Sequence, residues 1–283
     1  MKSVVITGVS SGIGWGATKV LIGKGFRVFG SVRKPADGER LKAEFGKNFV
    51  PLLFDVTDEP AIKRAAEEVR AALNGEKLFG LVNNAGIAVS GPLLDLNVED
   101  FRQQMEVNVT GPFLVTQSFA PLLGADRSLK GEPGRIVNIS SVGGKQAAPF
   151  VGPYSASKFA LEGMSESLRR ELMLFGIDVI VIGPGAVKTL IWDKAEQVDI
   201  TPFANSAYYP SLVKFRDYFL ASGKAGLPPE QLGRLILKAL TTAKPKVRYA
   251  ILRGKLANWT IPQRLPKRFL DRTIGKAIGL IEK

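Results

Sequence analysis

Residues 3–22 constrain the fold of this chain more than any other stretch. A β-branched run at residues 3–7 leads into Gly-Val-Ser-Ser-Gly-Ile-Gly at residues 8–14, and helix-forming residues continue to Ile22. Because glycines allow a sharp turn after a buried strand, we predict a strand, a loop and a helix in that order. Free N–H groups at the start of such a helix attract a pyrophosphate. An ordinary turn is the alternative, since the spacing differs from the general Gly-x-Gly-x-x-Gly form.

The alternation of strands and helices continues along most of the chain. Further strands are predicted at residues 26–32, 48–54, 78–82, 134–139, 177–182 and 247–252, with helical segments between them. This pattern predicts an α/β fold, a doubly wound parallel sheet. We expect one domain over residues 1–260 within the 283-residue chain, followed by an extension at 261–283.

Tyr154 and Lys158 form the strongest candidate for proton transfer. They follow the turn-forming Gly152-Pro153, and their four-residue spacing places both on one face of a predicted helix. A nearby ammonium favours the phenolate, so we expect Lys158 to lower the pKa of Tyr154 toward the working pH. By itself the pair is more often part of a solvated helix face.

The absence of cysteine and histidine narrows the possible chemistry. The sequence contains neither residue, so a zinc-dependent alcohol dehydrogenase and any Ser-His or Cys-His nucleophilic mechanism are excluded. Tyrosine and lysine are therefore the main candidates for proton transfer near neutral pH.

Five motifs occur together in a characteristic order. They are Thr7-Gly8-x-x-x-Gly12-x-Gly14, Asn83-Asn84-Ala85-Gly86, Asn108, Ser141 with Tyr154-x-x-x-Lys158, and Pro184-Gly185. Over residues 2–190 the chain resembles the short-chain dehydrogenase/reductase family. The sequence around Asn83 and the long C-terminal extension look like those of the hydroxysteroid and retinol dehydrogenase branch.

The resemblance implies a metal-free catalytic set. In such enzymes Ser141 would hold the substrate carbonyl, Tyr154 would transfer the proton, and Lys158 would lower the tyrosine pKa and bind the nicotinamide ribose. Asn108 would hold a water that links Lys158 to solvent, although an asparagine satisfied by neighbouring backbone is the alternative. For Asn83 we expect a mainly structural role.

The resemblance also implies a nicotinamide dinucleotide site, and one junction within it indicates the form. Val32, at the end of the second strand, stands where relatives that use NAD carry an acidic residue, and Arg33 follows it, which favours NADP(H) with Arg33 on the 2′-phosphate. Ser31 and Lys34 would assist, and a simple surface arginine is the alternative. The other expected cofactor contacts are Gly8, Ser10, Ser11, Gly12, Ile13, Gly14, Asp55, Val56, Asn84, Ala85, Gly86, Tyr154, Lys158, Pro184, Gly185, Val187 and Thr189.

Aromatic residues gather in residues 190–227, which the resemblance identifies as a substrate lid. A lid of this composition would bury an apolar substrate and exclude water. We expect Phe150 and Trp192 to contact the substrate together with Ser141 and Tyr154. The alternative is that the aromatic side chains only pack the lid onto the body.

The C-terminal segment carries much of the net charge of +13. Residues 261–281 place apolar side chains at helical spacing with Arg and Lys between them, which predicts a basic amphipathic helix. Such a helix could lie on an anionic membrane or pack over the substrate opening, and it is too short to span a bilayer. A nucleic-acid partner rests on the charge alone and is disfavoured.

These observations favour an NADPH-dependent reductase of a lipophilic ketone, or the reverse alcohol dehydrogenase. A 3-oxoacyl thioester reductase and a non-catalytic NADPH-binding sensor are the alternatives. By resemblance we expect a homodimer or homotetramer. The first residues lack a signal peptide's apolar region, so a cytoplasmic location is expected.

Overall fold

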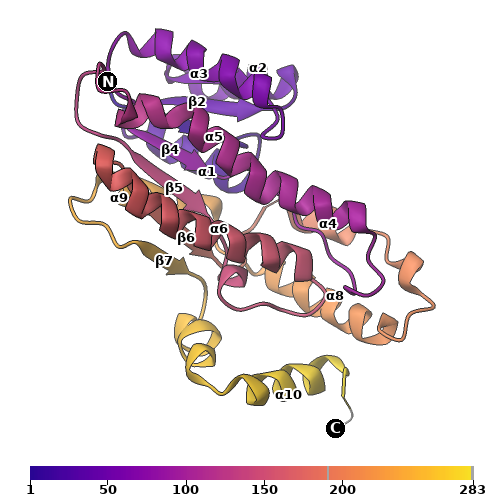
Figure 1. Ribbon diagram of the computed structural model, residues 1–283. Coiled ribbons are helices and arrows are strands. Elements are labelled where there is room, and N and C mark those ends of the chain that lie inside the picture. The colour runs from indigo at the N-terminus through magenta and orange to yellow at the C-terminus, as the bar shows by residue number, and fades with distance from the viewer. Residues whose placement is uncertain (190, 282–283) are drawn as a thin grey trace.

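A seven-stranded parallel sheet forms the centre of the molecule (Figure 1). The computed structural model describes residues 1–189 and 191–281, so Leu190 at the start of the predicted lid and the last two residues of the tail lie outside it. The strand order is β3-β2-β1-β4-β5-β6-β7. The strands are β1 (Ser3–Ile6), β2 (Arg27–Val32), β3 (Phe49–Leu53), β4 (Gly80–Asn83), β5 (Arg135–Ile139), β6 (Asp178–Pro184) and β7 (Arg248–Ile251). All seven predicted strands are therefore confirmed.

Helices cover both faces of the sheet, as a doubly wound fold requires. Helices α1 (Gly12–Ile22), α2 (Pro35–Phe45) and α9 (Pro229–Thr241) pack on one face, where Leu21 and Ile236 are fully buried. Helices α3 (Glu59–Leu73), α5 (Gly111–Ala120) and α6 (Gly152–Glu171) cover the other face. The central strand β1 is buried along its whole length, because helices cover both sides of the sheet.

The direction of winding reverses between β1 and β4. Val5 of β1 lies beside Phe29 of β2 on one side and Leu81 of β4 on the other. In open parallel sheets, ligands bind outside the carboxyl ends of the strands at such a reversal. The glycine turn after β1 and the Asn-Asn-Ala-Gly segment after β4 both lie at this point.

One long helical element, predicted over residues 98–123, crosses the side of the sheet (Figure 1). It consists of α4 (Val98–Met105), a π-helical turn η2 (Glu106–Thr110) and α5. The wider turn lies directly before Pro112, which sits in the first turn of α5. Such π-helical turns often occur at functional sites.

The C-terminal third contains further helical elements, and those at residues 209–224 and 267–278 contribute to a smaller apolar cluster beside the sheet. These elements include α7 (Ile191–Glu196), α8 (Tyr209–Lys224), a π-helical turn η7 (Leu256–Thr260) and α10 (Lys267–Ile278). The predicted amphipathic helix is confirmed as α10, and its Ile274 and Ile278 pack into a cluster with Phe150 and Phe215. Within residues 1–189 and 191–281, no helix combines the length and the apolar character needed to cross a membrane.

Candidate active site

Tyr154 and Lys158 lie in the first two turns of α6. Pro153 is favourable at this start, because a helix leaves its first N–H groups unpaired. The Lys158 Nζ is 5.7 Å from the centre of the Tyr154 ring and donates a 2.9 Å hydrogen bond to the Ile139 carbonyl at the end of β5. The helix therefore holds both side chains at the carboxyl end of the central sheet.

Burial controls the protonation of both groups. It lowers the pKa of Lys158 from 10.5 to about 8, and the Glu162 carboxylate acts in the opposite direction. Burial also raises the pKa of Tyr154, while a hydrogen bond with Ser141 offsets part of the effect. The expected lowering of the Tyr154 pKa is thus wrong for this structure, because desolvation of the phenolate outweighs the hydrogen bond with Ser141.

Ser141 stands at the end of β5 with its side chain near Tyr154. Its Oγ accepts a 3.0 Å hydrogen bond from Gly143 N–H, which fixes the short turn η4 (Val142–Gly144). Ser140 differs, because its buried Oγ has no hydrogen-bond partner among the described residues. Of the two serines, Ser141 is the one that the structure brings to the tyrosine.

Asn108 connects the π-helical turn η2 to the active-site helix. Its Oδ1 accepts from Ile87 N–H at 2.9 Å, and its Nδ2 donates to the Ile87 carbonyl at 3.0 Å and to Ser157 Oγ at 3.1 Å. A side chain at Gly86 would come within 3.1 Å of Asn108 Oδ1 and 3.8 Å of Lys158 Nζ. Asn108 is therefore held by backbone groups, as the structural alternative predicts, and also lies beside the lysine.

Gln104 is a neighbour of Asn108 that was not predicted as a site residue. It is fully buried, its Oε1 accepts from Val89 N–H at 2.7 Å, and its Nε2 donates to the Ile87 carbonyl at 3.0 Å. Its position four residues before Asn108, on the same helix face, was the available signal. Together the two amides hold the segment after β4 against the long helix.

The glycine turn after β1 is packed too closely for side chains. Gly8 and Gly12 have φ values of 69° and 59°, and a Cβ at Gly14 would lie 2.2 Å from the Gly8 carbonyl oxygen. Asn84 Nδ2 donates to the carbonyls of Thr7 and Gly8 at 2.9 and 3.0 Å. The turn is thus fixed by the segment after β4, and Ile13 and Gly14 follow in α1.

The start of α1 has the character of an anion site. Ser11 precedes the helix and makes no capping hydrogen bond through its side chain, so the first helical N–H groups keep their capacity to donate. Ser10 lies beside them and its carbonyl accepts a 2.7 Å hydrogen bond from Arg40. Arg40 was not predicted, and its spacing from the turn in the sequence carried no signal.

The predicted 2′-phosphate contact lies at the end of β2. Arg33 is largely exposed, and its Nη1 is 3.6 Å from Asp55 Oδ2, which follows β3. Asp55 Oδ1 accepts from Thr57, and Val56 is buried next to Gly111. Ser31 is buried and its Oγ accepts from Gly8 N–H at 3.0 Å. Ser31 therefore holds the turn, while Arg33 stays accessible.

The segment after β6 closes the opposite side of the site. Thr189 lies over the glycine turn, since a Cβ at Gly12 would be 3.0 Å from its methyl carbon. The Val187 carbonyl accepts a 2.6 Å hydrogen bond from Trp192 Nε1. Pro184 is the last residue of β6, and Gly185 follows it. The Pro184 carbonyl is 3.5 Å from Ser141 Oγ. These residues bring the lid to the predicted nicotinamide end.

Phe150 and Trp192 both join aromatic contacts of the lid. Phe150 packs edge to face against Tyr208 and Phe215, with ring centres 6.2 and 5.6 Å apart, and its φ of 61° is unusual for a large side chain. Trp192 meets Phe219 at 4.9 Å. Tyr154 packs against the same cluster as Phe150. The packing alternative accounts for these contacts, and the cluster also adjoins the tyrosine.

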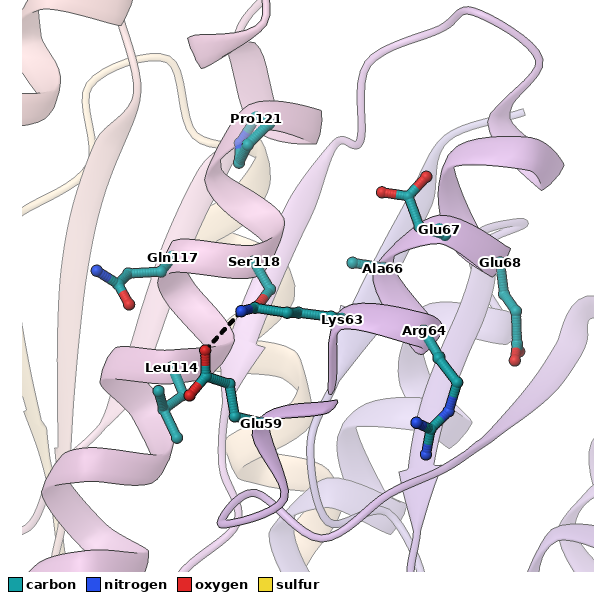
Figure 2. Close-up of a pocket in the computed structure, with 10 residues that line it drawn as sticks. All are labelled: Glu59, Lys63, Arg64, Ala66, Glu67, Glu68, Leu114, Gln117, Ser118 and Pro121. Atoms are coloured by element: carbon teal, nitrogen blue, oxygen red, sulfur yellow. Dashed lines mark ion pairs between the residues drawn. The ribbon is translucent and has the colours of Figure 1, made fainter. Parts of the chain in front are cut away.

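A separate groove lies on the outer surface between α3 and α5 (Figure 2). Charged side chains from α3 face it, including Lys63, which forms a 2.6 Å ion pair with Glu59. None of the ten residues that line it belongs to the predicted catalytic or cofactor set. This groove is therefore distinct from the candidate active site.

Comparisons with known proteins agree with this geometry. The model of the short chain dehydrogenase family matches residues 2–199. An NADPH-dependent 3-dehydrocapnine reductase from Ornithobacterium rhinotracheale is 39% identical over 276 residues, which cover 98% of this chain and 97% of that protein. Human retinol dehydrogenase 5 is 34% identical over 96% of this chain and 87% of its own length. A short-chain dehydrogenase structure from Streptomyces avermitilis matches with a TM-score of 0.76 at 27% identity, covering 98% of this chain and 97% of that one.

Proposed function

The chain belongs to the short-chain dehydrogenase/reductase family, and from that premise we propose that it reduces a lipophilic ketone with NADPH. One observation carries the proposal: Ser141, Tyr154 and Lys158 meet at the end of β5, and the apolar lid cluster adjoins the tyrosine. The glycine turn lies at the switch point of the same sheet edge. The residues that we propose for the cofactor, for proton donation and for the apolar substrate therefore lie in one region.

The residues around the switch point fit a dinucleotide. The cradle of Gly8, Gly12 and Gly14 has no side chains, and helical N–H groups follow it. Arg33 offers a guanidinium at the end of β2, which suits the additional phosphate of NADP(H). When bound, NADPH supplies the hydride. The similar 3-dehydrocapnine reductase is described as NADPH-dependent, which supports NADP(H) as the cofactor here.

The protonation state of the site favours reduction. Because the Tyr154 pKa is raised, the phenol keeps its proton at neutral pH and can donate it to the oxygen of a carbonyl under reduction. Ser141 Oγ would donate a hydrogen bond to that oxygen and hold it near the phenol. Lys158 would support the tyrosinate left after proton transfer, and Asn108 would connect the lysine to solvent.

The substrate class follows from the lid. Phe150 and Phe215 present aromatic rings in the cluster that adjoins Tyr154, and Trp192 packs on Phe219 of the same cluster, an arrangement that would bury an apolar substrate and exclude water. Relatives are named for 3-dehydrocapnine and for retinol, so 3-dehydrocapnine, retinal as the oxidised form of retinol, and steroid ketones are the first candidates. Measuring NADPH and NADH oxidation with them and with 3-oxoacyl thioesters tests the proposal. Turnover of thioesters alone would favour the acyl alternative, and NADPH binding without any turnover would favour a sensor.

Self-association is proposed through the faces of α5 and α6. Phe113 and Phe159 lie on these two helices and are 41% and 44% exposed. Large apolar side chains exposed on adjacent helices are typical of interfaces. We therefore expect a homodimer or homotetramer, which analytical ultracentrifugation of the wild type and of Phe113→Ser/Phe159→Ser would test. A wild-type monomer would contradict this assembly.

Peripheral contact with an anionic membrane is proposed for the C-terminal segment. The inner side of α10 packs on the lid, whereas Phe269 is 57% exposed beside Arg268, Arg272 and Lys276. Leu256 and Ile261 add exposed apolar side chains nearby in the chain. Apolar side chains flanked by cations suit an anionic bilayer surface.

Vesicle sedimentation tests this membrane contact. The wild type should sediment with phosphatidylcholine vesicles only when phosphatidylserine is included, and Phe269→Ser should weaken the binding. Leu94→Ser is the matched control, because Leu94 is 82% exposed in another part of the surface. Binding to oligonucleotides but not to vesicles would contradict the proposal.

A cytoplasmic location is the corresponding proposal for the cell, and fractionation would test it.

A further inference from the structure

A buried ion pair joins the active-site helix to the last strand of the sheet. Glu162 lies one helical turn after Lys158 and is 6% exposed. Arg248, at the start of β7, donates from Nε to both carboxylate oxygens of Glu162 at 3.0 and 2.9 Å. Its Nη2 is also 2.9 Å from Glu162 Oε1. The two side chains thus form a bidentate pair between segments that are 86 residues apart in sequence.

The same arginine reaches the backbone of the catalytic serine. Arg248 Nη2 donates a 3.2 Å hydrogen bond to the carbonyl of Ser141. Lys145, just after the Ser141 turn, approaches Glu162 Oε2 at 3.6 Å. The pair therefore contacts both ends of the short segment that carries the Ser141 hydroxyl.

The fold leaves room for this pair at two glycines. A Cβ at Gly183 would lie 2.4 Å from Arg248 Nη2 and 3.1 Å from the Ser141 carbonyl oxygen. A Cβ at Gly144 would lie 3.1 Å from Glu162 Cγ and 3.0 Å from the Lys158 carbonyl oxygen. Side chains at either position would push the ion pair away from the active site.

The pair also connects the site to the C-terminal segment. The Arg248 guanidinium lies 4.9 Å from the centre of the Trp259 ring, and Trp259 is 8% exposed. An aromatic ring over a guanidinium favours the cation and holds its plane. The orientation of the arginine therefore depends on residues that follow β7.

Stability alone gives little reason for a buried pair of this kind. Desolvation of two charges offsets most of their attraction, and apolar side chains of similar volume are often as stabilising. A positional role explains the arrangement better, because the third hydrogen bond of Arg248 goes to Ser141. The nearest charged and titratable groups around Lys158 in this network are Tyr154 and Glu162 on α6, Lys145 after η4 and Arg248 on β7.

We propose that Glu162 and Arg248 are positioning residues that hold the Ser141 segment against α6 and keep a carboxylate near the Lys158 ammonium. This inference rests on the proposed reductase function. Through the Ser141 backbone, the pair fixes where the serine hydroxyl meets the substrate oxygen. Through Glu162, it favours the charged form of Lys158 and so opposes the effect of burial at that group.

Arg248→Lys tests the positional role. Lysine keeps the charge but cannot make the bidentate contact together with the Ser141 hydrogen bond. We expect kcat to fall about tenfold, because a small misplacement of a reacting group is costly, while NADPH affinity is unchanged. The double variant Glu162→Gln/Arg248→Met removes both charges and avoids an unpaired buried ion, so it gives the same test if Arg248→Lys folds poorly.

Arg135→Met is the matched control. Arg135 is a half-buried arginine at the start of β5, and its Nη1 donates to the carbonyls of Ala239, Leu240 and Thr242 near the end of α9. Its loss should lower the melting temperature and leave kcat unchanged. If Arg248→Lys also kept the wild-type kcat in an active enzyme, the positional role would be overturned.

A titration tests the electrostatic role without turnover. With ¹³C-labelled lysine, the Lys158 resonance is assigned by comparison with Lys158→Met, and its titration is followed by NMR. In Glu162→Gln, Lys158 should titrate at a lower pH than in the wild type, because the carboxylate that favours the ammonium is lost. An unchanged titration overturns this role. A wild type inactive on every ketone would contradict the proposed function, and the titration would still decide the role of the pair.

Discussion

The glycine turn and the aromatic lid lie on two sides of the same site but are held by different interactions. Directed hydrogen bonds fix the turn: Asn84 binds two of its carbonyls, and Ser31 accepts from Gly8 N–H. The lid is held mainly by aromatic contacts, such as those of Phe215 with Phe150 and Phe219. Hydrogen bonds specify one geometry, whereas apolar contacts tolerate changes of shape.

This difference separates chemistry from selectivity. Ser141 and Lys158 are held by directed hydrogen bonds beside the end of β5, from Gly143 N–H to Ser141 Oγ and from Lys158 Nζ to the Ile139 carbonyl. The lid and α10 share side-chain packing with Tyr154, and those of their residues that the structure describes add no hydrogen bond to it. Changes in the first region should therefore affect kcat or cofactor binding, and changes in the second should affect substrate affinity.

Tyr154→Phe should produce the largest effect. Without the phenol proton, kcat should fall about 10²- to 10⁴-fold, the usual contribution of a general acid. NADPH affinity should hardly change, since the ring that packs on the lid is kept. Steady-state kinetics and a fluorescence titration with NADPH measure both quantities. A variant with the wild-type kcat would remove Tyr154 from the mechanism.

Gly14→Ala should have the next largest effect, because it disrupts the glycine turn at residues 8–14. The new Cβ would lie 2.2 Å from the Gly8 carbonyl oxygen, so the turn has to move. We expect NADPH affinity to fall at least about tenfold and the free energy of unfolding to fall by about 1–3 kcal/mol. Gly163→Ala is the control, because among the described residues no atom beyond its own stretch of helix lies within 4 Å of its Cβ position. Equal NADPH affinity in both variants would show that the turn is not the phosphate site.

Arg33→Ala should change the choice of cofactor. The loss of a charged hydrogen bond to the 2′-phosphate should weaken NADPH binding about tenfold and leave NADH binding nearly unchanged. Comparing kcat/KM for the two cofactors measures the effect. Arg27→Ala, at the start of the same strand, is the control. A wild-type enzyme that prefers NADH would already contradict the role of Arg33.

Trp192→Phe tests the lid side of this comparison. The smaller ring loses the Nε1 hydrogen bond to the Val187 carbonyl and part of its contact with Phe219. For an apolar ketone we expect KM to rise about three- to tenfold with little change in kcat, as for the loss of one or two buried methylenes. Tyr218→Phe is the control, because Tyr218 is 70% exposed. A large fall in kcat would place Trp192 with the chemistry instead.

The free energy of unfolding should depend on pH through the buried Lys158. Its pKa is about 8 when folded and 10.5 when exposed, so between these values the unfolded chain binds more protons. Stability should therefore rise with pH from 8 toward 9.5, by about 1 kcal/mol per pH unit at most, relative to Lys158→Met. Urea unfolding at several pH values measures this slope. Identical slopes in the two proteins would show that the buried lysine is not the cause.

Local patterns were sufficient to predict the strands and the residues that lie at their ends. Tyr154 and Lys158 were predicted because four residues along a helix place two side chains together. The glycine turn was predicted because a strand, glycines and a helix follow each other directly. In both cases the informative residues are close in sequence, so periodicity was enough.

Contacts between distant segments could not be predicted in this way. Glu162 and Arg248 are 86 residues apart, and nothing in either local pattern indicates a pair. The pKa of Tyr154 was predicted in the wrong direction, because the extent of burial depends on α8, α10 and the lid together. For Phe150 and Trp192, composition indicated an apolar lid, and the packing partners came only from the structure.

Hydride transfer from NADPH to a ketone is the reaction that we propose for this enzyme. It is tested by incubating the enzyme with NADPH deuterated at C4, in separate preparations for the two faces of the ring, and an apolar ketone from the candidate set. Mass spectrometry of the product then locates the label. We predict that one of the two preparations places deuterium on the carbinol carbon, and that Tyr154→Phe nearly abolishes this product. Alcohol formed without deuterium from either preparation would contradict the account.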